Sequence, residues 1–344
     1  MKQKMLTEAS IFIFVIIVCR FMIEAGLSKQ GATSLFLKAH SSWVLQIASG
    51  FHAWMYMAEV LPVLMLLMLI YLHYKAISCR YFRGILKCVL MGTILSYTLT
   101  AVQWVSESEL WRLGLVFNTF GRNLIPWMVY SIGCGQLLLM VFYQLNKDES
   151  LDSNVSLLIQ TVSMLSALSS TVILLSGVQG PLVALVSIIG GCCIMRLNNM
   201  EWHSEHGTSP LSVIQWNLLA VCLFFCTGHW CAFDGLRYGA AFIGFDEFSL
   251  ARQAILLTVD TFGFSHILPI FGLPLLAQGD RFGNASASKR RVLTQLTLVY
   301  LIHGMVAAST VAVMMVCVAI HRRHLMVWGL FAPKFVFEVV GLLL

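Results

Sequence analysis

The stretch VSLLIQTVSMLSALSSTVILLSGVQGPLVALVSIIGGCCIM, residues 155–195, decides the fold class of this chain. It contains no charged residue, and Gly177 and Gly180–Pro181 interrupt it near its middle. A helix that crosses the hydrocarbon core of a bilayer needs roughly 20 mostly apolar residues. Glycine and proline are the strongest local signals for a turn. The stretch therefore predicts two membrane helices, 155–176 and 178–195, joined by a tight turn.

The whole chain shares this apolar character. It has 344 residues, of which 58% are hydrophobic and 11% are charged, and its mean hydropathy is +0.82. Soluble domains carry about 25% charged residues, so this chain cannot cover its own surface with polar groups. The composition predicts an integral membrane protein. The net charge of +6 is modest and does not indicate nucleic acid as a partner.

Further apolar segments lie on both sides of the opening stretch. Together they predict an all-α, polytopic membrane protein with about ten transmembrane helices. The polar segments between them are shorter than the roughly 50 residues that a soluble domain needs. We therefore expect residues 1–344 to form a single transmembrane helical domain. The other expected spans are 9–27, 54–74, 85–103, 124–144, 211–227, 251–276, 292–320 and 325–344.

The basic residues favour one orientation. With the N-terminus in the cytosol, more lysines and arginines fall in cytosolic loops than on the other side, as membrane proteins prefer. The segment 224–248 then faces the lumen or the exterior. The two sequons, at Asn154 and Asn284, fall in cytosolic loops, so we expect neither to be glycosylated. One span more or fewer would invert this assignment.

The segment FFCTGHWCAFDGLRYGAAFIGFDEF, residues 224–248, carries several groups with chemical potential. His229 and Asp234 form an H-x4-D pattern like that of glycerolipid acyltransferases, in which a carboxylate orients the histidine as a base. Cys226, His229 and Cys231 are possible zinc ligands, but zinc needs three or four converging ligands. The alternative for both patterns is a loop between two membrane helices.

Ionisable residues inside expected spans give a second set of candidates. Asp260 and His266 lie in the span 251–276, and His303 lies in the next one. An unpaired carboxylate in hydrocarbon costs several kcal/mol, so we expect Asp260 to face a polar cavity or a partner helix. Pro269 and its neighbouring glycines predict a broken helix, which is tolerated where it is buried in protein or lines a wet cavity. A headgroup site and an ion path both fit these observations.

Long blocks of sequence add a resemblance. FDGLRYGAAFIGFDEF (233–248), DTFGFSHILPIFGLPLL (260–276) and HRRHLMVWGLFAPKFVFEVVG (321–341) resemble the C-terminal membrane region of the GPI ethanolamine phosphate transferase 3 family. The block 121–140 fits as well. The resemblance implies transfer of ethanolamine phosphate to the third mannose of the GPI precursor in the endoplasmic reticulum membrane. It implies phosphatidylethanolamine and the GPI precursor as lipid partners, together with a small multi-span stabilising subunit.

The same resemblance limits what the chain is expected to do alone. Members of the family place catalysis in a lumenal domain that resembles alkaline phosphatase, with divalent metal, zinc by resemblance, and a threonine nucleophile. No segment of this chain resembles that domain. We therefore expect no catalytic residue, no cofactor and no metal site in this chain, and a role in holding lipid substrates or in subunit assembly.

The candidate site residues follow from both arguments. We expect His229, Asp234, Arg237, Asp260 and His266 to contact a lipid headgroup or to line a polar cavity. Arg237 offers several donors to a phosphate, and the alternative is that these residues brace the loop against neighbouring helices. Two other function classes stay open: a transporter or scramblase that uses an intramembrane Asp/His path, and an enzyme based on His229 and Asp234.

Overall fold

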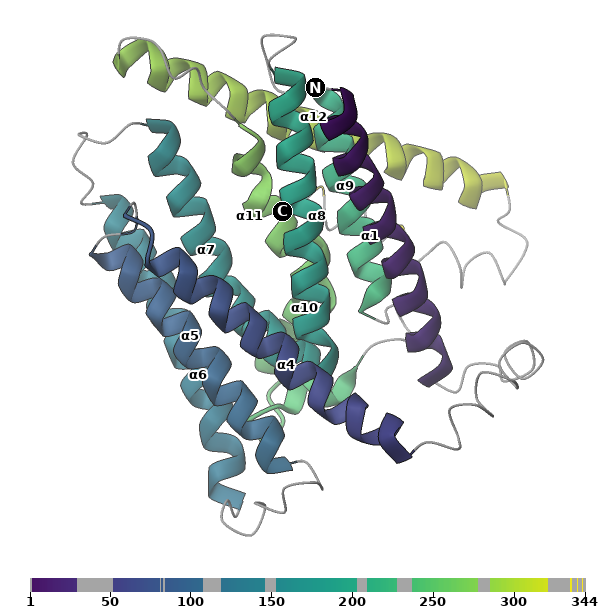
Figure 1. The fold of residues 1–344 in the computed structure, drawn as a ribbon. Helices are drawn as coiled ribbons and strands as arrows, with labels where there is room; N and C mark the ends of the chain where they lie inside the picture. Colours follow the sequence, from purple (N-terminus) through teal and green to yellow (C-terminus); the bar gives the residue numbers. More distant parts are fainter. Residues whose placement is uncertain are drawn as a thin grey trace.

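The protein is a bundle of α-helices (Figure 1). The computed structural model describes residues 2–29, 52–80, 82, 84–107, 119–145, 153–202, 209–227, 237–277 and 285–320, and three isolated residues nearer the C-terminus. Within these residues all regular structure is helical, which confirms the all-α class. The long helices are α1 (Lys2–Lys29), α4 (His52–Ile77), α5 (Ile85–Glu107), α6 (Thr119–Leu145), α7 (Ser153–Ser176), α8 (Gly180–Trp202), α9 (Pro210–Cys226), α10 (Leu250–Phe262) and α12 (Ala285–Ile320).

The apolar stretches of the helices make this a multi-pass membrane protein. Six stretches of the described residues are long and apolar enough to cross a membrane. One of them, 156–199, contains both α7 and α8, and α9 is a shorter apolar helix. The first nine expected spans coincide with helices, whereas the expected span 325–344 lies almost wholly outside the described residues. The number of about ten spans therefore stays a prediction.

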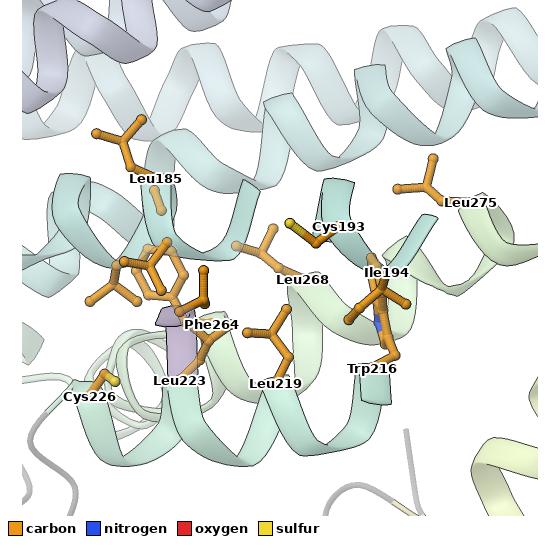
Figure 2. Packing of buried hydrophobic residues seen from close by; sticks show 14 of the residues in the cluster. Leu185, Cys193, Ile194, Trp216, Leu219, Leu223, Cys226, Phe264, Leu268 and Leu275 are labelled. Atoms are coloured by element: carbon orange, nitrogen blue, oxygen red, sulfur yellow. The ribbon is translucent and has the colours of Figure 1, made fainter. Parts of the chain in front are cut away.

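The helices pack in two groups, which α4 and α7 connect. On one side of the bundle α5 contacts α4, α6 and α7, and α6 contacts α7. On the other side α1, α8 and α9 contact one another, and α8 also contacts α4 and α7. The main core lies where α8 and α9 meet the segment after α10, and Figure 2 shows Leu219, Leu223, Phe264 and Leu268 facing one another there. These side chains are buried, so the core is continuous across three elements.

The turn between α7 and α8 is as tight as the sequence predicts. A short helical turn, η2 (Gly177–Gln179), directly joins the two helices. Gly177 has a φ of +63°, in the left-handed region that favours glycine. A Cβ atom on Gly180 would lie 2.9 Å from the carbonyl oxygen of Ile173, so this position also requires glycine. The backbone conformation at Gly177 and the close approach at Gly180 therefore explain why both turn positions are glycine.

The expected break in the span 251–276 is a change of helical winding. After α10 the chain forms a π-helical turn, η4 (Gly263–Ile267), a short α-helix, α11 (Leu268–Gly272), and a 3₁₀ turn, η5 (Leu273–Leu276). A Cβ on Gly263 would lie 2.7 Å from Val172 of α7, so the π-helical turn marks a close approach of two elements. Helical turns thus continue through the span without a gap.

Side chains from three other helices hydrogen-bond to the carbonyl groups of this irregular segment. The indole N–H of Trp216 (α9) donates to the Pro269 carbonyl at 2.9 Å. The Tyr300 hydroxyl (α12) donates to Ile270, and the Asn198 amide (α8) donates to Leu276, both at 3.2 Å. At membrane depth, backbone groups freed from regular helix need partners within the protein. α8, α9 and α12 supply them here.

The two ends of the bundle carry different elements. Figure 1 shows the start of α1 and the end of α8 at one end. The α7–α8 turn and the short helix η3 (Tyr238–Phe242) lie at the other end. The segment that follows Arg237 is therefore remote from the N-terminus, which is the relative placement that the alternating spans predict.

Candidate functional site

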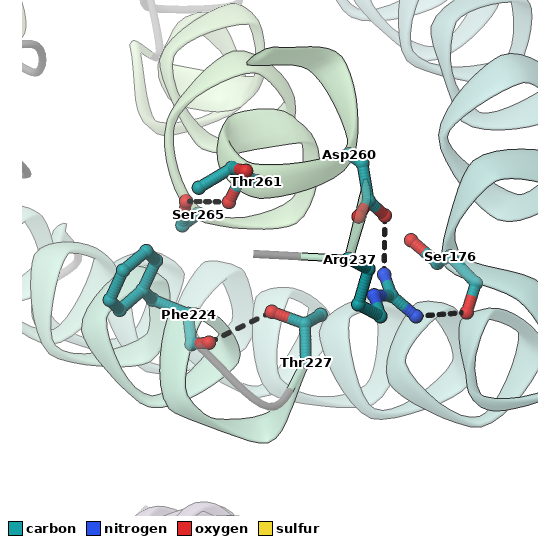
Figure 3. Close-up of polar contacts among 7 residues, drawn as sticks. All are labelled: Ser176, Phe224, Thr227, Arg237, Asp260, Thr261 and Ser265. Atoms are coloured by element: carbon teal, nitrogen blue, oxygen red, sulfur yellow. Dashed lines mark hydrogen bonds and ion pairs between the residues drawn. The ribbon is translucent and has the colours of Figure 1, made fainter. Parts of the chain in front are cut away.

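A buried ion pair joins the segment after residue 236 to the membrane helices. The guanidinium of Arg237 donates through Nη2 to Oδ1 of Asp260 in α10 (Figure 3). The Asp260 side chain is 0% exposed and the Arg237 side chain is 29% exposed. The partner of the intramembrane carboxylate is therefore a loop arginine at the end of the bundle. Because a buried charge without a partner is strongly unfavourable, this pair fixes where the loop meets α10.

Arg237 also completes the end of α7. Its Nη1 donates to the carbonyl oxygen of Ser176 at 2.8 Å, and Ser176 is the last residue of α7. The last carbonyl groups of a helix lack partners within the helix, and the negative end of the helix dipole favours a cation there. One guanidinium thus satisfies a helix end and a carboxylate from two different elements.

Among the residues that the structure describes, three polar atoms at this junction are buried and have no hydrogen-bond partner. They are Oδ2 of Asp260, Nε of Arg237 and Oγ of Ser176. The great majority of buried polar atoms in proteins are paired, so three orphan atoms around one ion pair set this junction apart. Oδ2 of Asp260 can only accept a hydrogen bond, Nε of Arg237 can only donate one, and the Ser176 hydroxyl can do both. A small charged or polar group would find complementary partners here.

The N-terminal half of α6 holds residues 243–246 of the loop in place. The indole N–H of Trp127 donates to the Gly244 carbonyl, and the Tyr130 hydroxyl donates to Ile243 at 3.2 Å. The Asn123 amide donates to Asp246 at 2.6 Å. Gly244 has a φ of +83°, and a Cβ there would lie 2.8 Å from Pro126. The loop is therefore docked by side-chain to backbone contacts that need glycine at one position.

An aromatic contact extends this docking to the start of α10. The ring of Phe245 stacks on Tyr130 with 6.0 Å between centroids, and the Arg252 guanidinium lies 4.1 Å from the Phe245 ring. The side-chain oxygen of Gln253 accepts from the Ser249 backbone N–H at 2.7 Å, which satisfies one of the free donors at the helix start. α6, the loop and α10 thus form one packed unit around the ion pair.

The other expected site residues fall elsewhere. His266 is buried in η4, where its Nδ1 lies 3.1 Å from the Ser265 hydroxyl and its ring meets Phe262 edge to face. His229 and Asp234 lie outside the described residues, and so does Cys231. The contact of these residues with a lipid headgroup stays a prediction.

Sequence reasoning singled out Arg237 and Asp260 but did not identify their surroundings. Ser176, Trp127, Tyr130 and Gly244 had no predicted role at the site. The available signal was the glycine inside FIGFDEF, because a glycine between aromatic residues marks a place where backbone and side chains approach closely. The pairing of Arg237 with Asp260 had no sequence signal beyond their opposite charges.

Metal binding finds no support in the described part of the chain. There, no group of three or more His, Cys, Asp and Glu side chains converges in a way that could hold a metal ion. The divalent metal that the family resemblance implies thus has no ligand set among these residues.

This architecture defines a polytopic, all-helical membrane protein with a polar junction at one end of its bundle. The family model of the GPI ethanolamine phosphate transferase membrane region matches residues 129–342, which is more than half of the chain. The chain therefore belongs to that family. Ser176, Arg237 and Asp260 all lie inside the matched region.

Three relatives agree with this assignment. The chain is similar to the mouse protein named GPI ethanolamine phosphate transferase 3, catalytic subunit, at 31% identity. It is similar to the human protein of the same name at 33% identity. Each match covers 38% of this chain and 15% of the relative. GPI ethanolamine phosphate transferase 3 of Eremothecium gossypii is 28% identical over 37% of this chain and 12% of its own length.

The chain thus matches only a small part of the length of these relatives. No solved structure matches the chain.

Proposed function

We propose that this chain serves as the membrane region of a GPI ethanolamine phosphate transferase and holds lipid substrates for the transfer reaction. The observation that carries the proposal is the position of the Arg237–Asp260 junction inside the family region, at one end of the bundle. A site at a helix-bundle end lies where the headgroups of membrane lipids lie. The chain would act by binding and orientation, which contribute a large part of catalysis when two substrates must meet.

The chemistry of the junction suits a zwitterionic ethanolamine phosphate headgroup. An arginine can bind phosphate through several N–H groups, and Nε of Arg237 is a donor with no partner in the described part of the chain. The second carboxylate oxygen of Asp260 is an acceptor that no described residue pairs with, which suits an ammonium group. Arg237 retains a partly exposed side chain, so a headgroup can reach it from the bundle end.

By the family resemblance, the lipid donor is phosphatidylethanolamine and the acceptor is the GPI precursor, whose third mannose receives ethanolamine phosphate. We further propose that the chain resides in the endoplasmic reticulum membrane and assembles with a small multi-span stabilising subunit. Alone, the chain would be non-catalytic.

The test uses the chain itself in two cell lines. In cells that lack GPI ethanolamine phosphate transferase 3, the chain alone should not restore surface GPI-anchored proteins, measured by flow cytometry. In cells that have the enzyme, excess chain should lower the surface level, because it competes for lipid substrate and for the stabilising subunit. Arg237→Ala should weaken this competition. Arg196→Ala, which removes a largely exposed arginine from its ion pair with Glu8 at the other end of the bundle, should not.

Two results would count against the proposal. Restoration by the chain alone would place catalysis in these loops, with His229 and Asp234 as the first residues to replace. In the second cell line the chain is present in excess over the enzyme. If the surface level of GPI-anchored proteins does not change there, both lipid holding and subunit assembly are contradicted.

A further inference from the structure

A cavity of about 310 Å³ lies within the helix bundle, away from the ion pair. Six elements contribute to its wall: α4, α5, α7, α8, α9 and the segment 264–275. Most of the lining is aliphatic or aromatic, and Figure 2 shows part of it, with Leu219 and Leu223 of α9 opposite Phe264 and Leu268. Its volume is at the lower end of the roughly 300–1,000 Å³ of small-molecule sites.

A polar strip interrupts the apolar lining on the side of α4, α5 and α7. His73 Nδ1 lies 2.9 Å from the Leu69 carbonyl, and Nε2 lies 3.1 Å from the Ser166 hydroxyl. Because a carbonyl only accepts, Nδ1 must carry the proton that is donated to Leu69. In the neutral ring Nε2 is then an acceptor. The single hydrogen of the Ser166 hydroxyl is used within the protein, because its oxygen lies 2.8 Å from the Val162 carbonyl as well as 3.1 Å from Nε2.

The tyrosine of this strip is also committed to partners within the protein. The Ser169 hydroxyl donates to the Ser166 carbonyl at 2.7 Å, which uses its only hydrogen. The Tyr97 hydroxyl, 2.7 Å from Ser169 Oγ, must therefore be the donor in that contact. The His73 and Tyr97 rings meet edge to face at 5.3 Å. Every donor in this strip thus has an acceptor within the protein.

A wall whose donors are all used does not select a charged headgroup. Burying a polar or charged group without new hydrogen bonds is unfavourable, and this strip has no free N–H or O–H for a phosphate. Outside this strip, Ser187 and Cys192 of α8 are the polar or thiol side chains in an otherwise apolar lining. The chemistry that fits the cavity is therefore that of an alkyl chain.

The location of the cavity indicates where such an alkyl chain would come from. α7 and α8 belong to the most apolar of the membrane-spanning stretches, with a mean hydropathy of 2.2. Ile188 of α8 lines the cavity and is also 38% exposed, so the cavity reaches the outer surface of the bundle there. Around a membrane-spanning bundle, that surface faces the acyl chains of lipids.

We propose that this cavity binds one acyl chain of a membrane glycerolipid. The inference rests on the proposed lipid-holding function and deepens it. Along α7, Ser169 of the polar strip is seven residues from Ser176 at the ion pair, a rise of about 10 Å at 1.5 Å per residue. A lipid whose headgroup contacts Arg237 would reach the cavity with one chain, so the two sites would hold the two ends of one molecule.

Photo-crosslinking of the full chain in nanodiscs tests this directly. The probe is phosphatidylethanolamine with a diazirine near the end of one acyl chain, and the crosslinked peptides are identified by mass spectrometry. We expect crosslinks at cavity-lining positions of α7, α8 and α9. Ser187→Phe, which adds a ring at a lining position, should reduce these crosslinks by about fivefold or more, because the ring occupies the space of the chain.

The chain offers a matched control on the same helix. Ile189→Phe adds a ring two residues away at an exposed position that does not line the cavity, and it should leave the crosslinks unchanged. If Ser187→Phe does not accumulate, Ala184→Leu introduces a smaller obstruction at another lining position. Wild-type crosslinks confined to outward residues such as Leu138 and Phe142, or crosslinks that both obstructing variants leave unchanged, would overturn the proposal.

Two further probes identify the source of the chain. Phosphatidylcholine and phosphatidylinositol with the same diazirine-labelled acyl chain should crosslink to the same cavity peptides if the cavity binds the acyl chain regardless of the headgroup. A stronger signal from phosphatidylethanolamine, lost in Arg237→Ala, would support the linked headgroup site as well. If the cavity is labelled but excess protein does not lower surface GPI-anchored proteins in cells, the proposed function is wrong and the acyl-chain site stands. If excess protein lowers the surface level but the cavity is not labelled, only the acyl-chain site is wrong.

Discussion

At the scale of single residues, Arg237 connects three elements. It donates to the end of α7 and to Asp260 of α10, and it lies in the loop that α6 holds. The charge of Asp260 is thus neutralised from the end of the bundle, where an arginine can keep part of its side chain accessible. This arrangement reconciles a buried carboxylate in an apolar helix with a polar site near lipid headgroups.

Removal of this arginine should destabilise the protein strongly. Arg237→Ala leaves Asp260 charged, buried and unpaired, and we expect the free energy of unfolding to fall by about 3 kcal/mol. Thermal unfolding of the purified chain in detergent measures this loss. Arg237→Ala combined with Asp260→Asn should lose less than the sum of the two single changes, because no unpaired charge remains.

The ion pair between Arg196 and Glu8, with 3.0 Å between its charged atoms, is the control, because the Arg196 side chain is 63% exposed and the Glu8 side chain 14% exposed. Arg196→Ala should cost less than Arg237→Ala, because water screens the Arg196 guanidinium. Equal losses for Arg196→Ala and Arg237→Ala would contradict the central position given to Arg237.

Gly244 is a second position where one residue decides the local structure. Gly244→Ala combines a φ of +83° with a Cβ 2.8 Å from Pro126, so the loop should detach from α6. We expect a loss of about 1–3 kcal/mol, typical of a strained backbone position. Protection of the backbone amides of residues 243–249 from hydrogen exchange should fall, whereas Gly239→Ala, at a position with free space, should leave it unchanged.

At the scale of elements, the segment 250–276 changes winding three times and stays compatible with the membrane. Trp216, Tyr300 and Asn198 satisfy the carbonyl groups that a regular helix would have paired. The same tryptophan packs so closely on α11 that a Cβ on Gly272 would lie 2.7 Å from its ring. α9 therefore both packs on the irregular segment and satisfies one of its carbonyl groups.

Trp216→Phe separates these two contributions, because it keeps an aromatic ring and removes the N–H. The Pro269 carbonyl loses a buried donor, and we expect a loss of about 1–3 kcal/mol in the free energy of unfolding. Tyr300→Phe removes the donor to Ile270 at an exposed hydrogen bond, so its effect should be smaller. Thermal unfolding of both variants under the same conditions measures the two losses of stability. A larger loss for Tyr300→Phe would show that burial of the hydrogen bond does not determine its contribution to stability.

At the scale of the whole molecule, alternating helices place the loop after residue 236 and the turn after α4 at opposite ends of the bundle. Cys79 lies in that turn and is exposed. Tyr238, at the start of η3, is 63% exposed. The two positions therefore report on the two faces of the membrane.

A membrane-impermeant maleimide should distinguish them in sealed vesicles. We expect Cys79 to be labelled from one side only, and Tyr238→Cys to be labelled from the other side only. Mass spectrometry of the labelled peptides gives the result, and a permeant maleimide, which should label both, is the control. Labelling of both positions from the same side would contradict the helix arrangement.

Much of the fold could be predicted from the sequence because each element carries its own signal. Long apolar runs predicted the helices, and glycine with proline predicted the α7–α8 turn. The change of winding after Gly263 was predicted only as a break, since the sequence does not say how the freed carbonyl groups are satisfied. That answer comes from Trp216, Tyr300 and Asn198, which lie in other helices.

The site was less predictable because it depends on packing between distant elements. Asp260 was expected to have a polar partner, but the partner belongs to a loop 23 residues away and not to a neighbouring helix. Ser176 contributes a backbone carbonyl, which no residue type reveals. The cavity likewise depends on how six elements meet, so the serines that line it looked like ordinary polar residues of membrane helices.

The most direct measurement of the central claim places this chain in the setting of its relatives. A hybrid of human GPI ethanolamine phosphate transferase 3, catalytic subunit, would carry residues 129–342 of this chain in place of its own membrane region, and it would be expressed in cells lacking that enzyme. Mass spectrometry of the GPI precursor then reports ethanolamine phosphate on the third mannose. Our account predicts that the hybrid restores this product and that Arg237→Ala in the hybrid reduces it. A stably present hybrid that gives no product would contradict the account.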